Sequence, residues 1–262
     1  MNICIIGCGS IGSVLAKAVS DFSEVEKIFL LDSSHEHAQK LSQTLENSEI
    51  LESIDSIPDE VELVIEAASQ QAIQEFGAKI LAKGKDLMIM SVGALIDTEF
   101  YERLLELAKA NHATINIPSG AIGGLDVVNS AAIEEIYEVS LKTSKPPLGL
   151  KDIPFITAAG IDVEKIERPT VVFDGSAEEA IQKFPLNINV SSILALAGTG
   201  KDRTRVRIIV DPDIERNVHE ISMRGEFGAM KCTIQNKPHP QNQRDKYIIP
   251  KPAHHFHNIF LA

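Results

Sequence analysis

The sequence has little positive charge and no long apolar run, and each absence excludes a class of protein. Its 25 Lys and Arg are outnumbered by 37 Asp and Glu, which gives a formal net charge of −12. Nucleic-acid binding depends on clustered cations that neutralise phosphates, so we expect no nucleic-acid partner. No apolar stretch approaches the roughly 20 residues that span a bilayer, and Met1 leads directly into a strand-like run, so we expect neither membrane association nor a signal peptide.

Cysteine is also scarce. Cys4, Cys8 and Cys232 form neither an even disulfide framework nor a Cys-x-x-Cys pair, and no Cys/His spacing resembles a zinc site. We therefore expect a cytoplasmic protein with reduced thiols and no bound metal. The 262 residues, 44% hydrophobic and 24% charged, are enough for one large globular domain or two modest ones.

The N-terminal stretch contains a dinucleotide-binding pattern. An apolar run ends in three glycines, Gly7, Gly9 and Gly12, and is followed by a helical run of small residues and a second apolar run that ends in an acid. In such a βαβ unit the first glycine allows a tight turn, the second lets the backbone approach a pyrophosphate, and the third lets the helix pack closely on the sheet. The helix N-terminus, at Ser10 and Ile11, directs free N–H groups at the phosphates.

The acid at the end of the second run is Asp32, twenty residues after Gly12. A carboxylate there accepts hydrogen bonds from a ribose 2′-hydroxyl and repels a 2′-phosphate, so NAD is favoured. NADP stays possible because Ser33 and Ser34 follow and could receive a phosphate. An ordinary glycine turn is the alternative, but it does not explain why strand, helix and acid all occur at the expected distances.

Strand-length apolar runs alternate with amphipathic helical segments through the first part of the chain. This alternation predicts an α/β fold with a Rossmann-type, doubly wound parallel sheet. Ligands gather at the carboxyl ends of such strands, so Ala67 and Ala68 are expected to line the cofactor. Pro118 is the predicted end of this dinucleotide-binding domain, residues 1–118.

The pattern changes in the second half of the chain. Its last three strand-like segments follow one another without a helix, which predicts antiparallel pairing in a smaller α+β C-terminal domain, residues 119–240. Residues 241–262 contain Pro250 and Pro252, which exclude a continuous helix. A histidine cluster in this last segment could bind metal, but we expect a poorly ordered tail.

Three features of the second half are candidates for chemistry, each with an alternative. The glycine-rich segment 118–124 could hold an anion on its N–H groups or be an interdomain turn. Of Asn187 and Asn189, one is explained as a helix N-cap and the other is left to contact a ligand. His219 begins a strand, where most histidines are solvated or satisfied, yet the unperturbed pKa of histidine suits proton transfer.

A basic segment is the fourth candidate. Lys201, Arg203, Arg205 and Arg207 could attract a dianionic substrate, because Arg binds carboxylates in a bidentate fork. The alternation of the arginines equally describes one solvated strand face, and we favour that interpretation.

Four segments together resemble the L-aspartate dehydrogenase family. They are Gly7-Cys8-Gly9-Ser10-Ile11-Gly12, Pro118-Ser119-Gly120-Ala121-Ile122-Gly123-Gly124, Phe184-Pro185-Leu186-Asn187-Ile188-Asn189-Val190, and Asn217-Val218-His219-Glu220-Ile221 with Gly225-Glu226-Phe227-Gly228. Many dehydrogenases share the first segment, whereas the other three in this order are specific. The resemblance runs from Met1 to about Asn242.

The resemblance implies roles for particular residues. An alanine of the S-G-A-I segment and an asparagine of the N-x-N-V segment contact NAD in that family, and the histidine of the H-E-I segment is catalytic. The matching positions are Ala121, Asn189 with Asn187 as its neighbour, and His219. The family's usual form is a homodimer of two-domain chains, in which the second domain serves catalysis and dimerisation.

The activity implied is NAD(P)-dependent oxidative deamination of L-aspartate, with His219 as general base. The product iminoaspartate either feeds NAD biosynthesis or is hydrolysed to oxaloacetate and ammonia. Two alternatives stay open: another two-domain NAD(P)-dependent reductase, of the dihydrodipicolinate or homoserine type, and a non-catalytic NAD-binding sensor, against which Asn189 and His219 argue. Beyond Asn242 the chain departs from the family's motifs, and loss of a final helix would expose apolar surface.

Overall fold

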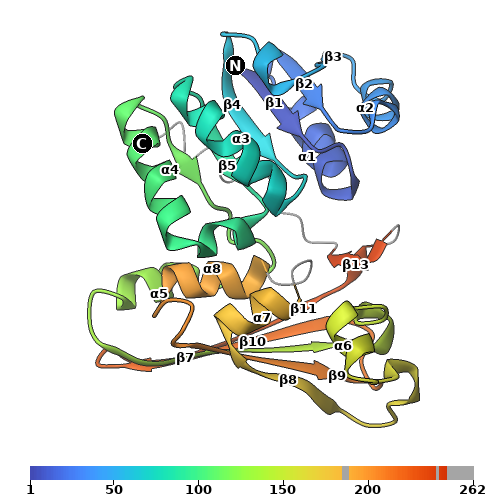
Figure 1. Cartoon of the computed structure of the whole chain (residues 1–262), viewed down its shortest axis with the longest axis vertical. Helices are drawn as coiled ribbons and strands as arrows, with labels where there is room; N and C mark the ends of the chain where they lie inside the picture. Colours follow the sequence, from blue (N-terminus) through green and yellow to red (C-terminus); the bar gives the residue numbers. More distant parts are fainter. Residues whose placement is uncertain (185–188, 240–241, 247–262) are drawn as a thin grey trace. The chain divides into compact units, whose positions relative to one another are not determined.

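The structure, a computed structural model, describes residues 1–184, 189–239 and 242–246 (Figure 1). The chain divides after Pro118 into two compact units, Met1–Pro118 and Ser119–Ile248. Among the described residues no helix has both the length and the apolar character needed to cross a bilayer.

The first unit contains a six-stranded parallel sheet in the order β3-β2-β1-β4-β5-β6. Its strands are β1 (Asn2–Ile6), β2 (Lys27–Leu31), β3 (Ser48–Ile50), β4 (Val61–Glu66), β5 (Asp86–Ile89) and β6 (Ile115–Asn116). The chain runs outward from β1 in one direction and then from β4 in the other, so the strand order reverses between β1 and β4. In a doubly wound sheet a ligand binds at the carboxyl edge beside this reversal.

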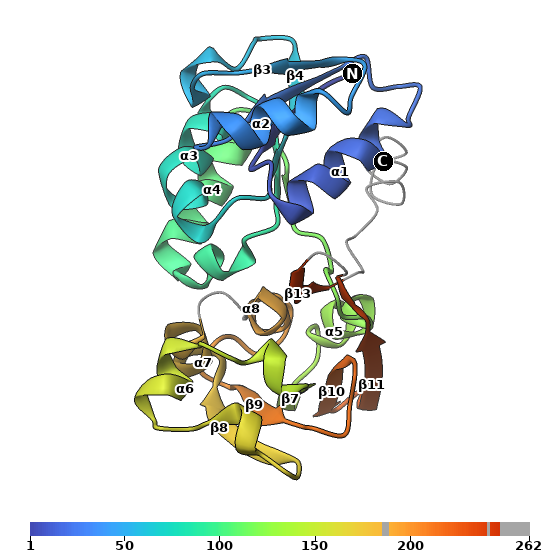
Figure 2. The same ribbon diagram turned by 90° about the vertical axis from the view of Figure 1, so that its right-hand side faces the viewer.

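Helices cover both faces of the sheet: α1 and α2 pack into one core cluster, and Figure 2 shows α1 on the opposite side of the sheet from α3 and α4. They are α1 (Ser10–Ser20), α2 (His35–Ser42), α3 (Gln70–Ala82) and α4 (Thr98–Ala110), with short 3₁₀ turns η1 (Ile54–Ser56) and η2 (Val92–Ile96). The N-caps of α3 and α4 follow from their side chains. Ser69 Oγ accepts the N–H of Ala72 at 3.1 Å, and Asp97 Oδ1 accepts that of Phe100 at 3.1 Å.

The core of the first unit explains its continuous apolar runs. A strand covered by helices on both faces buries every side chain, so it does not alternate with polar residues. The core on the α1 and α2 side consists of Ile3, Ile5, Cys8, Leu15, Ala16, Val19, Val25, Ile28, Leu30, Ala38, Leu41, Leu63, Ile65 and Met88. These contacts fix the ends of β1, β2 and β4, where the predicted cofactor residues lie.

The second unit contains a five-stranded mixed sheet in the order β11-β10-β7-β9-β8. Its strands are β7 (Ile136–Lys145), β8 (Thr170–Ser176), β9 (Thr204–Val210), β10 (Asn217–Gly225) and β11 (Gly228–Asn236). Its helices are α5 (Leu125–Ala131), α6 (Pro154–Ala158), α7 (Ala177–Lys183) and α8 (Asn189–Ala197), with 3₁₀ turns η3 (Pro147–Gly149) and η4 (Val163–Lys165). Helices α5, α7 and α8 lie over one face of this sheet (Figure 1).

The pairing in this sheet differs in part from the antiparallel arrangement predicted for its last three strands. Strands β10 and β11 are antiparallel as expected, but β9 pairs in parallel with β7 and is not a neighbour of β10. Strand β7 is inserted between them because it pairs with β10 on its other edge. Succession in the chain therefore did not indicate which strands are neighbours.

Residues along β7 and β10 alternate between the two faces of the sheet. Thr143 and His219 face the helices, whereas their chain neighbours Lys142 and Glu220 lie on the open face and form an ion pair at 2.6 Å. The second unit thus has one helix-covered face and one charged face.

A correction concerns the start of the expected tail. Strand β13 (Asn242–Lys246) pairs antiparallel with β12 (Pro238–His239), so residues 242–246 are part of a two-stranded sheet. Pairing through backbone hydrogen bonds does not require an apolar sequence pattern, so the sequence did not indicate this strand. The rest of the predicted tail, including Pro250 and Pro252, lies outside the described residues.

Candidate active site

The glycine turn between β1 and α1 leaves no room for side chains at two of its three glycines. Gly7 has φ +95°, and a Cβ on it would lie 2.7 Å from the carbonyl carbon of Ala67. A Cβ on Gly12 would lie 1.7 Å from the carbonyl oxygen of Gly7. Gly9 differs, because none of the described heavy atoms lies within 4 Å of the place where its Cβ would be. The turn is therefore closely packed beneath and open above Gly9, as a backbone that receives a phosphate group requires.

The first turn of α1 adds an electrostatic feature to this opening. Ser10 and Ile11 begin the helix, Gly9 is its N-cap without a capping side chain, and the first turn carries no acidic residue. The first N–H groups of a helix have no partners within it and carry the positive end of the helix dipole. The arrangement suits a pyrophosphate.

Asp32 lies directly after β2 and holds the glycine turn. Its Oδ2 accepts the N–H of Cys8 at 2.6 Å, and its Oδ1 accepts the N–H of Ser34 at 2.7 Å. A carboxylate has about four acceptor positions, so two remain for the hydroxyls of a ribose. The nearby His37 Nδ1 is 3.7 Å from Oδ1. The carboxylate both organises the turn and keeps capacity for a ligand.

The loop after β4 packs against the same turn. The N–H of Ala67 donates to the carbonyl of Ile6 at 2.7 Å, and the Gly7 backbone lies against Ala67 and Ala68. Ala67 is half-buried and Ala68 is exposed. All the predicted cofactor residues of the first unit therefore meet at the carboxyl edge of its sheet, beside the reversal between β1 and β4.

His219 lies in the second unit, buried at the middle of the sheet. It is 2% exposed on β10, and its Nδ1 is 2.9 Å from Oγ1 of Thr143 on β7, the residue opposite it in register. When Nδ1–H donates to that hydroxyl, the lone pair is on Nε2, which is then the basic nitrogen. The structure therefore excludes the interpretation of His219 as a solvated strand-edge side chain and gives it a fixed ring orientation.

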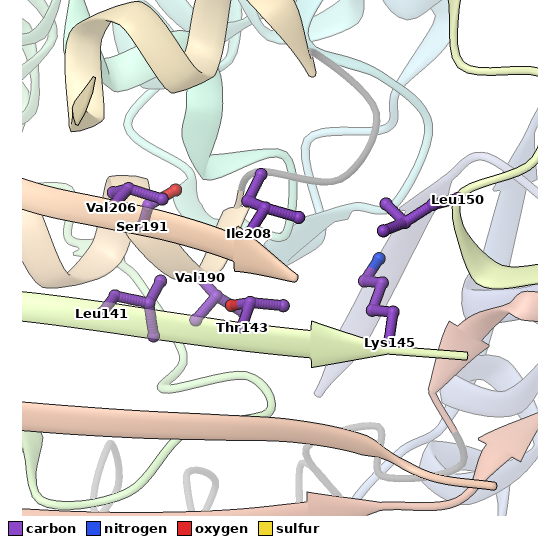
Figure 3. A pocket seen from close by; sticks show the side chains of 8 residues that line it. All are labelled: Leu141, Thr143, Lys145, Leu150, Val190, Ser191, Val206 and Ile208. Carbon is purple, nitrogen blue, oxygen red and sulfur yellow. The ribbon is translucent and has the colours of Figure 1, made fainter. Parts of the chain in front are cut away.

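A narrow pocket lies on the helix-covered face beside this pair (Figure 3). Thr143 and Lys145 line it from β7, and Val190 and Ser191 line it from the first turn of α8. Lys145 is 4% exposed, and Figure 3 shows its ammonium pointing toward Leu150. An ammonium in an apolar, water-poor surround interacts more strongly with an anion than an exposed one does.

Sequence reasoning missed Lys145. Its signal was its place on β7, where Leu141, Thr143 and Lys145 alternate and therefore point to one face. A lysine that continues a buried alternation is unusual, because lysine side chains are mostly exposed.

The remaining predicted residues of the second unit lie near the start of α8. Ala121 is buried, its carbonyl accepts Nδ2 of Asn236 at 3.0 Å, and the adjacent Gly120 lies near Ile193 of α8. Asn189 is the first residue of α8, one position before the pocket residue Val190. Asn187 lies outside the described residues.

The basic segment does not join this group. Arg205 and Arg207 extend from the open face and both bind Asp174, at 2.9 and 2.6 Å. The two arginines hold the pKa of that carboxyl below its usual range. Arg203 donates to the carbonyl of Ile136, and Lys201 pairs with Glu178. The favoured interpretation, a solvated strand face, agrees with the contacts of Arg205 and Arg207, whose side chains point away from the face that holds His219.

The fold and its two groups of side chains define a class. A doubly wound sheet with an open glycine turn and a second unit with a buried histidine belong to the two-domain NAD(P)-dependent oxidoreductases. Within the part of the chain that is described, no cluster of three or more His, Cys, Asp or Glu could hold a metal ion.

Comparison with known proteins narrows this class. The family profile "Homoserine dehydrogenase, NAD binding domain" matches residues 7–118, and "Aspartate dehydrogenase, C-terminal" matches residues 126–256. The L-aspartate dehydrogenases of Methanosarcina barkeri and Methanosarcina acetivorans are each 42% identical to this chain, over 97% of it and 94% of each relative. The crystal structure of aspartate dehydrogenase from Thermotoga maritima has a TM-score of 0.72 at 33% identity and covers 89% of this chain and 88% of its own.

The chain belongs to the L-aspartate dehydrogenase family. The family match continues to residue 256, so the likeness extends beyond Asn242, where the recognised motifs end.

Proposed function

We propose that this protein oxidises L-aspartate with NAD(P) to iminoaspartate and NAD(P)H. NAD(P), when bound, would supply the acceptor for the hydride of Cα. The amine would lose a proton to a base of the protein, and water added to the imine would release ammonia and oxaloacetate. The observation that carries this proposal is the buried His219–Thr143 pair beside Lys145, a base and a cation on one face of the second unit. Oxidation of an amino acid needs a base that takes a proton, and a cation binds the second carboxylate of a dicarboxylic substrate.

His219 is the general base in this proposal. Its Nε2 takes the proton of the amine or of the attacking water, and the bond from Nδ1 to Thr143 at 2.9 Å keeps the ring in position. Such a base needs a fixed orientation because proton transfer requires hydrogen-bond distance at the reacting atom.

Lys145 binds a carboxylate of the substrate. It reaches the pocket from the same strand as Thr143, two residues further along. The hydroxyl-bearing residues Thr143 and Ser191 also line this pocket, whose other lining residues are apolar. A cation there selects an acidic side chain over neutral amino acids.

In this proposal the cofactor is bound by the residues that the sequence predicts. Gly7, Gly9, Ser10, Ile11 and Gly12 receive the pyrophosphate, and Asp32 binds the ribose hydroxyls, which favours NAD over NADP. Ala67 and Ala68 are next to the nicotinamide half, and the family resemblance adds Ala121, Asn187 and Asn189 as cofactor contacts. Replacing Asp32 by alanine is expected to raise the NADP/NAD ratio of kcat/KM, and an unchanged ratio would remove its selective role.

Three wider properties complete the proposal. The product iminoaspartate supplies NAD biosynthesis. The protein acts in the cytoplasm, which agrees with its free Cys4, Cys8 and Cys232. It works as a homodimer. Sedimentation equilibrium tests the last point, and a monomer at working concentration contradicts it.

The decisive experiment measures NADH formation with a panel of L-amino acids and 2-hydroxy acids. We expect turnover with L-aspartate, and turnover of another substrate but not of L-aspartate would refute the assignment. NAD binding without any turnover would indicate a sensor. His219→Ala should retain NAD binding and lose most of kcat.

A matched control is available for Lys145, the residue proposed to bind a carboxylate of the substrate. Losing a charge-assisted hydrogen bond costs about 1.5–3 kcal/mol, so Lys145→Met should raise the KM for L-aspartate roughly 10- to 150-fold. Lys142→Met is the same substitution on the same strand, on the open face, where Lys142 pairs with Glu220. It should leave KM unchanged, and equal effects of both variants would exclude a specific role for Lys145.

A further inference from the structure

Glu66 is a buried carboxyl that none of the proposed steps uses. It is the last residue of β4, 1% exposed, and lies at the carboxyl edge of the sheet beside the strand reversal. Burial raises the pKa of this carboxyl, and hydrogen bonds from Ser91, Ala68 and Ser69 oppose the rise. A carboxyl in such a place costs free energy unless its oxygens are satisfied, so its contacts indicate what it does.

Both oxygens of Glu66 accept backbone N–H groups from two different loops. Oε1 accepts the N–H of Ala68 at 2.8 Å, in the loop between β4 and α3. Oε2 accepts the N–H of Ser91 at 3.0 Å, in the loop between β5 and η2, and the Ser91 hydroxyl donates to Oε1 at 2.7 Å. One side chain thus connects two neighbouring loops on the same edge of the sheet.

The place of these loops determines which half of the dinucleotide they meet. The pyrophosphate belongs over Gly9, and the adenosine ribose belongs at Asp32, after β2. The strand order β3-β2-β1-β4-β5-β6 puts β4 and β5 on the other side of β1, so the remaining half, the nicotinamide riboside, extends toward them. The two loops that Glu66 connects lie there.

We propose that Glu66 is a positioning residue that holds the β4–α3 and β5–η2 loops in the arrangement that receives the nicotinamide ring, at the end of the dinucleotide's nicotinamide riboside half. The inference rests on the proposed function only in taking NAD(P) as the ligand. It assigns Glu66 no contact with the substrate.

Glu66→Gln separates this role from packing. Glutamine has the same size but only one oxygen, so its NH₂ group must face either the N–H of Ala68 or that of Ser91. Two donors then oppose each other, and one loop is released. Glu62→Gln is the matched control, the same change on the same strand at an exposed position.

The test compares NAD with ADP-ribose, which lacks the nicotinamide, in calorimetric titrations without substrate. Glu66→Gln should lower the affinity for NAD roughly tenfold or more, the loss expected for one unmade buried hydrogen bond. It should change the affinity for ADP-ribose less than about twofold. Amide exchange at Ala68 or at Ser91 should accelerate in the apo protein, according to which loop is released. Glu62→Gln should change neither quantity.

Two results would overturn the proposal. An equal loss of NAD and ADP-ribose affinity would indicate a purely structural Glu66, and unchanged NAD affinity would show that the loops do not depend on it. Should Glu66→Gln not fold, Ser91→Ala removes only the hydroxyl donor and should shift NAD affinity in the same direction by a smaller factor, with ADP-ribose unchanged. Because no aspartate is present, failure to oxidise aspartate leaves this test intact.

Discussion

Replacing Thr143 by valine removes the hydroxyl that orients His219 and keeps the shape of the side chain. The bond between Oγ1 and Nδ1, 2.9 Å long, is buried, so the loss leaves a ring nitrogen without this partner. Such a loss costs about 1–3 kcal/mol of stability. If the same interaction also holds the ring for proton transfer, kcat falls by about 5- to 150-fold, since 1.36 kcal/mol corresponds to a factor of ten.

A second buried threonine in the same sheet supplies the control. Thr204 on β9 is fully buried, and its hydroxyl donates to the carbonyl of Gly200 at 2.8 Å. Its register partner on β7 is Val139, four residues before Thr143, or roughly 13 Å along the strand. Thr204→Val should therefore cost similar stability without affecting kcat.

Urea unfolding and steady-state kinetics of the two variants give the answer. We expect comparable losses in the free energy of unfolding and a loss of kcat confined to Thr143→Val. If both variants lose stability equally and both keep full kcat, the Thr143–His219 bond serves the fold alone, and the orientation argument is refuted.

Two further predictions follow from local geometry. Gly9→Ala should leave thermal stability unchanged, because its Cβ meets open space at φ −73°, but it should abolish NAD binding. Gly12→Ala should lose about 1–3 kcal/mol or more of stability, because its Cβ would overlap a backbone oxygen. A calorimetric titration with NAD and a melting curve distinguish the two variants. Burial raises the pKa of the Cys4 and Cys8 thiols to about 12, so iodoacetamide should alkylate Cys232 alone in the native protein. Modification of Cys4 or Cys8, detected by mass spectrometry, would contradict this.

The sequence indicates local features of this protein well. The glycine turn and the caps Ser69 and Asp97 depend on residues a few positions apart, so the order of residues in the sequence indicates them. Asp32 is recognised by its fixed spacing from the glycines within one βαβ unit. Continuous apolar runs indicated a sheet covered on both faces for the same reason.

Features that depend on contacts between distant segments could not be predicted from the sequence. The place of β7 between β9 and β10 is decided by pairing across long separations, and the burial of Lys145 on β7 follows from it. The burial of Glu66 follows from the loops after β4 and β5, which cover it. In the sequence, Glu66 is only an acid at the end of an apolar run. Only the positions of the N–H groups of Ala68 and Ser91 show that it connects two loops.

The alternation along β7 and β10 determines which kinds of mutation this protein tolerates. In the present register Thr143 is opposite His219, and the neighbouring pair Lys142 and Glu220 is on the open face. A shift of β7 by one residue would put Lys142 opposite His219 and turn Thr143 outward. Single-residue insertions and deletions in β7 should therefore be far more harmful than substitutions on the open face. We expect natural variation here to consist of exchanged surface charges with a constant strand length.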